Sequence, residues 1–194
     1  MYKYLKHVLI YSLILIYSCT DKVHEGKGLA LITNAQQAND NKKFNTIING
    51  FNKYIEKARE DLNKHEKSEK QLQNYDDYKI AINKYDKFIS WIEDNPDKKK
   101  ELDTDFTEAY NCLEQRRAEN APEKTLDEYI RDAIDCTNNP LSYKDTRKQY
   151  GTKNNQIFLF FTYNFHPLFH RKNTLKDILV KFKTLDISEI KDKF

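Results

Sequence analysis

The chain has 194 residues, of which 39% are hydrophobic, 13% aromatic and 32% charged. So high an aromatic content excludes an intrinsically disordered chain, because buried rings remove large apolar areas from water and build a core. Thirty-three basic against thirty acidic side chains give a formal charge of +3. This near balance excludes a strong positive field, so no nucleic-acid partner is expected. Only four glycines and four prolines favour long helices over many short strands.

The N-terminus joins a positive start to a short apolar run. Lys3 and Lys6 precede a mostly apolar stretch at residues 8–17. That stretch is short for a membrane-spanning helix, which needs about 20 residues, but it suits the apolar region of a signal peptide, which has about 7–15. We therefore interpret residues 1–18 as a signal peptide. An uncleaved anchor helix with an incidental cysteine is the alternative.

The next feature is the run Ile16, Tyr17, Ser18 and Cys19, which resembles a lipobox. At a lipobox, a bacterial prolipoprotein is acylated on the cysteine and cleaved before it. Tyr17 is bulkier than the usual occupant of its position, so the site is similar to the relaxed lipoboxes of spirochaetes. The resemblance implies a diacylglyceryl thioether and an N-acyl chain on Cys19, with a lipid bilayer as partner. Several acyl chains anchor a protein stably, whereas a single chain binds marginally.

Lipidation of Cys19 leaves Cys112 and Cys136 as a pair. Disulfides form outside the cytoplasm, and a bond between these two would contribute about 3 kcal/mol by restricting the unfolded chain. The helices expected on either side of Pro122 bring the two cysteines within a turn of the same level, so the disulfide is feasible. The alternative is one thiol in the core and one at a helix end.

A tether and then a helical domain follow the lipidated cysteine. Residues 19–41 contain Gly, Asn and Gln with little apolar content, which is typical of a flexible tether. In residues 42–139, apolar side chains recur at helical spacing. The first helix presents Phe44, Ile47, Ile48, Phe51, Tyr54, Ile55, Ala58 and Leu62. The second presents Tyr75, Tyr78, Ile82, Tyr85, Phe88, Ile89, Trp91 and Ile92.

Two further helices complete this domain. Asn95 and Pro96 begin the third, since asparagine caps a helix and proline fits its first position. We expect it to continue without a break through Leu102, Phe106, Ala109, Tyr110 and Leu113. Thr125 and Glu128 form a capping box. It opens a short fourth helix with Leu126, Tyr129, Ile130, Ala133 and Ile134 inward. Together the patterns predict an all-α fold, a small antiparallel helical bundle.

The last segment, residues 140–194, is basic and aromatic, with eleven Lys or Arg against five Asp or Glu. Residues 157–169 are aromatic without helical spacing, so we interpret them as strand-like or buried irregular structure. Thr174 then caps a final helix with Leu175, Ile178, Leu179, Phe182 and Leu185 on one face. The segment either completes the core or stays exposed as an apolar patch that a partner covers.

Candidate catalytic and metal-binding residues are sparse. His166 and His170 are four apart, as two metal ligands on a helix are, but Pro167 lies between them and no third ligand is near, so no metal site is expected. Neither a Gly-x-Ser-x-Gly motif nor a Ser/His/Asp spacing occurs. The acidic pairs Asp76-Asp77 and Glu93-Asp94 are interpreted as solvated helix surface. The sequence therefore predicts no enzyme activity and no cofactor.

The stretch from Tyr85 to Cys136 carries a family resemblance. Its patterned positions include Phe88, Trp91-Ile92, Phe106, Tyr110, Leu113, Arg116-Arg117, Tyr129-Ile130 and Ala133 to Cys136. They are similar to the plasmid-encoded OrfD-type lipoproteins of Borrelia spirochaetes. The resemblance implies an outer-membrane lipoprotein with a helical fold and no catalytic residues. After Gly151 the sequence departs from that pattern.

Two functions are expected from these features. The first is a lipid-anchored module on the cell surface that binds a protein or glycan of a host or vector. The second is a periplasm-facing structural lipoprotein of the envelope. The family resemblance favours the first. The sequence predicts neither the ligand nor the oligomeric state.

Overall fold

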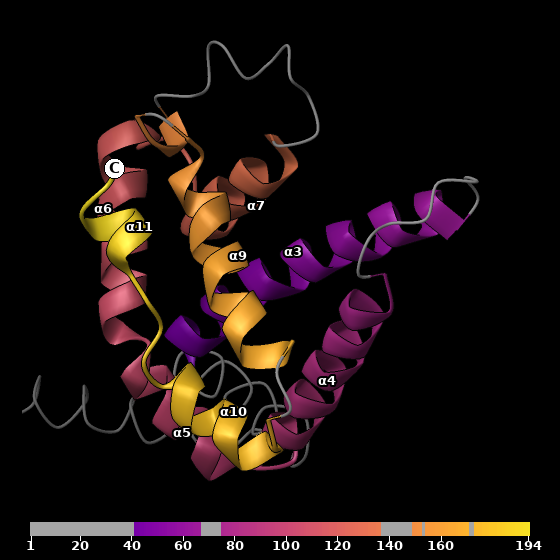
Figure 1. Cartoon of the computed structure of the whole chain (residues 1–194). Helices are drawn as coiled ribbons and strands as arrows, with labels where there is room; N and C mark the ends of the chain where they lie inside the picture. The colour runs from indigo at the N-terminus through magenta and orange to yellow at the C-terminus, as the bar shows by residue number, and fades with distance from the viewer. Residues whose placement is uncertain (1–40, 67–74, 137–148, 153, 171–172) are drawn as a thin grey trace, which may run out of the picture. The chain divides into compact units, whose positions relative to one another are not determined.

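The computed structural model describes residues 41–66, 75–136, 149–152, 154–170 and 173–194. Residues 41–194 form one packed unit, distinct from residues 1–40. The described ranges contain helices and short connections without any strand, which confirms the predicted all-α class (Figure 1). The predicted signal peptide, Cys19 and nearly all of the predicted tether lie outside these ranges.

Helices α3 (Lys42–Glu66) and α4 (Tyr75–Glu93) follow their predicted apolar faces. On α3 the buried apolar side chains are those of Phe44, Ile47, Ile48, Phe51, Tyr54, Ile55 and Leu62. The two helices are also linked by polar contacts. The Tyr85 hydroxyl donates to Asn52 Oδ1 at 2.7 Å, and Arg59 pairs with Asp86 at 2.6 Å.

The third predicted helix is divided in two, so the prediction of an unbroken helix is wrong. α5 (Pro96–Asp105) and α6 (Thr107–Asn120) meet at Phe106, whose φ and ψ are −78° and 0°. The ring of Phe106 is buried against Phe44 and Phe182, with centroid distances of 6.2 and 5.3 Å. Long-range packing therefore accompanies the break. Pro96 opens α5 as predicted, but Asn95 makes no cap hydrogen bond to it and instead donates to the Trp91 carbonyl in α4.

Helix α7 (Leu126–Asp135) begins at the predicted capping box. The Thr125 hydroxyl accepts from the Glu128 N–H, and the Glu128 carboxylate accepts from the Thr125 N–H. These reciprocal bonds satisfy N–H groups that the first turn of a helix leaves without partners. The far end of α7 is covered by Lys57 of α3, whose ammonium donates to the Ile134 carbonyl at 3.1 Å.

Residues 157–169 were predicted as strand-like or irregular, and that prediction is wrong: Gln156–Phe169 form helix α9. Its buried positions recur every fourth residue in adjacent pairs: Gln156, Ile157, Phe160, Phe161, Asn164, Phe165, Leu168 and Phe169. Pro167 lies in the last turn and is exposed, so its missing N–H falls where water reaches the backbone. The helix starts at Asn155, whose side chain accepts from the Phe158 N–H at 2.9 Å.

The chain ends in α10 (Leu175–Phe182) and α11 (Ser188–Lys191). Thr174 caps α10 as predicted, in a capping box with Asp177, whereas Leu185 lies beyond its end. Buried Asn164 of α9 fixes the connection to α11, because its amide donates to the Asp186 carbonyl and accepts from the Asp186 N–H at 2.9 and 2.8 Å. Arg116 of α6 donates to the carbonyls of Ile190 and Lys191.

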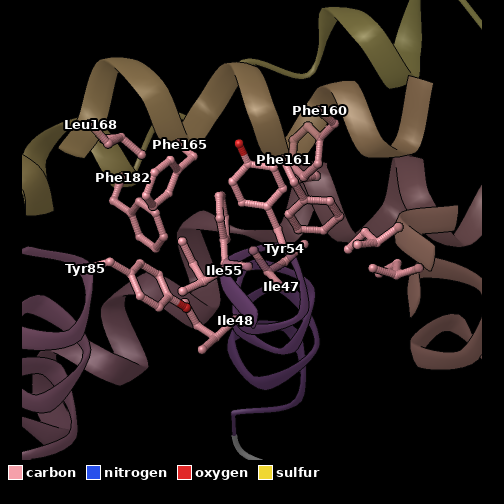
Figure 2. Packing of buried hydrophobic residues seen from close by; sticks show 14 of the residues in the cluster. Ile47, Ile48, Tyr54, Ile55, Tyr85, Phe160, Phe161, Phe165, Leu168 and Phe182 are labelled. Atoms are coloured by element: carbon pink, nitrogen blue, oxygen red, sulfur yellow. The ribbon is translucent and has the colours of Figure 1, made fainter. Parts of the chain in front are cut away.

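The core is built around α3 and α9. Helix α3 packs against α5, α6, α7 and α9, and α9 packs in addition against α4, α7, α10 and α11. Figure 2 shows the rings of Phe161 and Phe165 directed from α9 toward Ile47 and Tyr54 of α3. The described part of residues 140–194 thus completes the same core as residues 42–136. No helix within the described ranges is long and apolar enough to span a membrane.

Candidate functional site

Cys112 and Cys136 both lie within the described residues, and the disulfide between them stays a prediction. Their surroundings differ. Cys112 lies on α6 near Lys191 and Asp192, and burial raises the pKa of its thiol. Cys136 is the C-cap residue of α7. The alternative of one thiol in the core and one at a helix end also stays open to test.

A groove runs between α3, α4 and α9, with a volume of about 440 Å³. Its lining is apolar with a polar rim and consists of Tyr54, Lys57, Ala58, Asp61, Leu62, His65, Tyr78 and Phe158. Lys57 lies 5.3 Å above the Phe158 ring, and its partial burial lowers the pKa of the ammonium. Burial also raises the pKa of Tyr54 to about 12, so its phenol stays neutral. The sequence pattern assigned Tyr54 and Tyr78 only to apolar faces.

His166 and His170 lie one turn apart on α9, and their rings stack with centroids 4.5 Å apart. The Tyr78 ring from α4 meets both edge-on, at 5.5 Å from His166 and 4.9 Å from His170. The Tyr78 hydroxyl is 3.4 Å from His166 Nε2. Burial lowers the pKa of both imidazoles. Periodicity placed the two histidines one turn apart, but it did not show that Tyr78 covers them.

Among the described residues, no three His, Cys, Asp or Glu side chains are placed to hold a metal ion. The acidic pairs occupy exposed helix surface: Asp76 and Asp77 in the first turn of α4, and Glu93 at its end. Glu93 is paired with Lys99 at 2.7 Å.

A second, more polar hollow of about 500 Å³ lies beside the start of α9 and α11. It includes the buried side chains of Gln156 and Glu189, and Glu189 is paired with Lys193. Gly151 has a φ of 144°, and the Gln156 amide oxygen occupies the space that a Cβ there would need. A glycine is therefore required at this position for two reasons, conformation and close approach.

The proposed lipidation site, Cys19, lies outside the described residues. The described chain nevertheless begins at Asn41, at the first turn of α3, with 21 residues between it and Cys19 in the sequence. A segment of that length spans at most roughly 70 Å when fully extended. A lipid on Cys19 would thus connect to the helical unit through α3.

Comparison with known proteins gives a likeness to a bacterial lipoprotein. No family model matches the chain, and no solved structure matches it. The lipoprotein MlpJ of Borreliella burgdorferi is 28% identical over 150 residues. The match covers 74% of this chain and 66% of the relative, so the chain spans just under two thirds of that protein's length. The narrower OrfD-type resemblance stays a prediction. The chain is thus similar over most of its length to a Borreliella lipoprotein, which is consistent with anchoring to a membrane through lipid.

Proposed function

We propose that this protein is a lipid-anchored, non-catalytic interaction module on the outer surface of the cell, where its helical unit binds a protein or glycan partner. The likeness to the Borreliella lipoprotein carries the anchored part of the proposal. The lipobox-like run ending at Cys19 supports it independently, because it follows a signal-peptide pattern of the right length.

The division of the chain supports a role in binding. Residues 41–194 form their own packed unit, separate from the segment that carries Cys19. An anchor that is not part of the packed core leaves the surface of that core available to a partner. The groove between α3, α4 and α9 opens on that surface and is lined by three aromatic rings, Tyr54, Tyr78 and Phe158.

Protease treatment of intact cells tests the surface assignment. We expect the protein to be digested while a soluble periplasmic control protein survives. If it is digested only after the outer membrane is broken, the surface proposal is wrong. The protein would then be a periplasm-facing envelope lipoprotein, the second function that the sequence allows.

Replacement of the lipidation site tests the anchor. Cys19→Ala removes the acyl chains, so we expect the protein to move from the detergent phase to the aqueous phase on phase separation. Cys112→Ala is the matched control, because it also removes one cysteine but is expected to leave partitioning unchanged. Retention of the Cys19→Ala protein in the detergent phase would contradict lipid anchoring at this residue.

A further inference from the structure

The first turns of α4 rest on α9 through one aromatic cluster. Tyr78 is the α4 member, and the stacked imidazoles of His166 and His170 are the α9 members. His170 Nε2 is buried and has no hydrogen-bond partner, while His166 Nε2 faces the Tyr78 hydroxyl at 3.4 Å. Phe165 lies edge-on to both imidazoles, at 6.2 and 5.9 Å. In this arrangement the two rings pack as neutral groups.

Besides Tyr78, this part of α4 contacts Glu66 at the end of α3, to which the Tyr75 hydroxyl and the Lys79 ammonium donate. From residue 75 to residue 80 no side chain is buried, and Ile80 is 50% exposed. The next residues, Ala81, Ile82 and Tyr85, are in the core. Tyr85 meets Phe169 at 5.3 Å, so the rest of α4 is fixed on α9 independently of the histidines. Loss of the aromatic cluster would therefore release residues 75–80 from α9, while their contacts with Glu66 of α3 and the helix beyond them stay in place.

The charged groups around the cluster have opposite effects on the pKa of His170. On α4, Asp77 favours a proton on His170, whereas Lys84 opposes it. The carbonyl end of α9, where His170 is the C-cap residue, also favours a cation. On the α3 side, Tyr54, Lys57, Asp61 and His65 share the groove with Tyr78. Arg171 and Lys172 follow in the sequence, outside the described residues.

Repulsion between the two imidazoles determines whether both can carry a proton at the same time. If these surroundings permit one proton, the second must enter a ring whose centroid is 4.5 Å from a cation. At that distance, between two half-buried rings, like charges repel each other. Burial adds to this, because it disfavours both charged forms. Two protons are accommodated only when the rings separate and reach water.

We propose that Tyr78, His166 and His170 form an acid-sensitive latch, which releases residues 75–80 of α4 from α9 when both histidines are protonated. Release removes Tyr78 from the wall of the groove between α3, α4 and α9 and so widens that groove. Acidification would thus change the accessible surface of the helical unit while its core stays folded. The latch depends neither on the lipid anchor nor on a binding partner.

Hydrogen exchange of the whole protein at pH 7.5 and pH 5.5 tests the latch, with rates corrected for the intrinsic effect of pH. We expect protection of peptides within residues 75–80 to fall at least fivefold more than protection of peptides from α6. In His166→Gln/His170→Gln, that pH-dependent difference should disappear. His65→Gln is the matched control, because it removes a histidine that lines the same groove on α3, and its exchange should respond to pH as the wild type does.

Equal loss of protection in the wild type and the double glutamine variant would overturn the proposal, as would unchanged protection in the wild type. If the double variant fails to fold, NMR titration of the histidine ring protons in the wild type gives the answer. We expect the rings of His166 and His170 to titrate in two separated steps, with the second proton bound at distinctly lower pH. Both rings titrating together near pH 6.5 would overturn the latch.

Discussion

Replacing Gly50 with alanine would place a methyl group where the ring of Phe161 lies. A Cβ at this position of α3 would be 2.2 Å from Phe161 Cζ, 2.5 Å from Cε1 and 3.1 Å from Ile130 Cγ2. Carbon atoms in contact are about 3.5–4.0 Å apart, so the ring must withdraw by about 1 Å or more. It has little room, because Phe51 and Phe160 pack edge-on against it at 5.1 and 5.0 Å.

Two effects of Gly50→Ala oppose each other. Alanine is favoured over glycine inside a helix by about 1 kcal/mol. Overpacking a core costs about 1–3 kcal/mol and occasionally more. The overlap involves two ring atoms at far below contact distance, which places the cost near the upper end. We therefore expect a net loss of about 1–2 kcal/mol in the free energy of unfolding, although the local helix propensity improves.

Urea unfolding followed by far-UV circular dichroism measures this change. With a slope of about 2 kcal/mol per M, the midpoint should fall by about 0.5–1 M. A double-mutant cycle with Phe161→Leu identifies the cause, since the smaller side chain makes room for the methyl group. We expect the double variant to be more stable than the sum of the two single changes predicts, by about 1 kcal/mol. A rise in the midpoint for Gly50→Ala would refute the steric argument.

Three further predictions concern other parts of the unit. Asn164→Ala leaves the N–H and carbonyl of Asp186 without their partner, so the free energy of unfolding should fall by about 2–3 kcal/mol. Urea unfolding measures this change, and a fall of less than about 0.5 kcal/mol would contradict the prediction. Thr125→Ala removes one half of the α7 capping box and should cost about 1 kcal/mol, whereas Thr125→Ser should retain most of the stability. Burial raises the pKa of Tyr54 to about 12, so its contribution to stability is complete below pH 10 and is lost as pH rises toward 12. Absorbance at 295 nm should therefore show late-ionising tyrosine that appears together with alkaline unfolding, and complete ionisation near pH 10 in folded protein would exclude the effect.

Local signals in the sequence were sufficient to predict the helices in much of the helical unit. The apolar faces of α3 and α4 were predicted because their outward positions are polar, which makes the helical period visible. Thr125 with Glu128, and Thr174, marked the starts of α7 and α10, since a capping side chain bonds within its own first turn. Signals of this kind involve residues three or four apart and need no partner from elsewhere in the chain.

Helix α9 shows where such signals fail. Its buried positions do recur every fourth residue, but two of them, Gln156 and Asn164, are polar. The positions between them include Phe158, Leu159 and Tyr163, which are as apolar as the buried ones. The buried and outward faces of α9 therefore do not differ in hydrophobicity, and the helical period is hidden in the sequence. Burial of eight of its fourteen residues favours a helix, because a helix satisfies its backbone hydrogen bonds internally.

The sequence by itself determined the all-α class and the starts of the capped helices, because each depends on neighbouring residues, whereas lipidation at Cys19 stays a prediction. Only the tertiary structure decided the break at Phe106, the close approach of α9 at Gly50 and the meeting of Tyr78 with His166 and His170. These features join residues far apart in the chain, and the direction from which a partner arrives is set by the packing of whole helices. Periodicity states which face of a helix is buried, whereas packing determines what covers it.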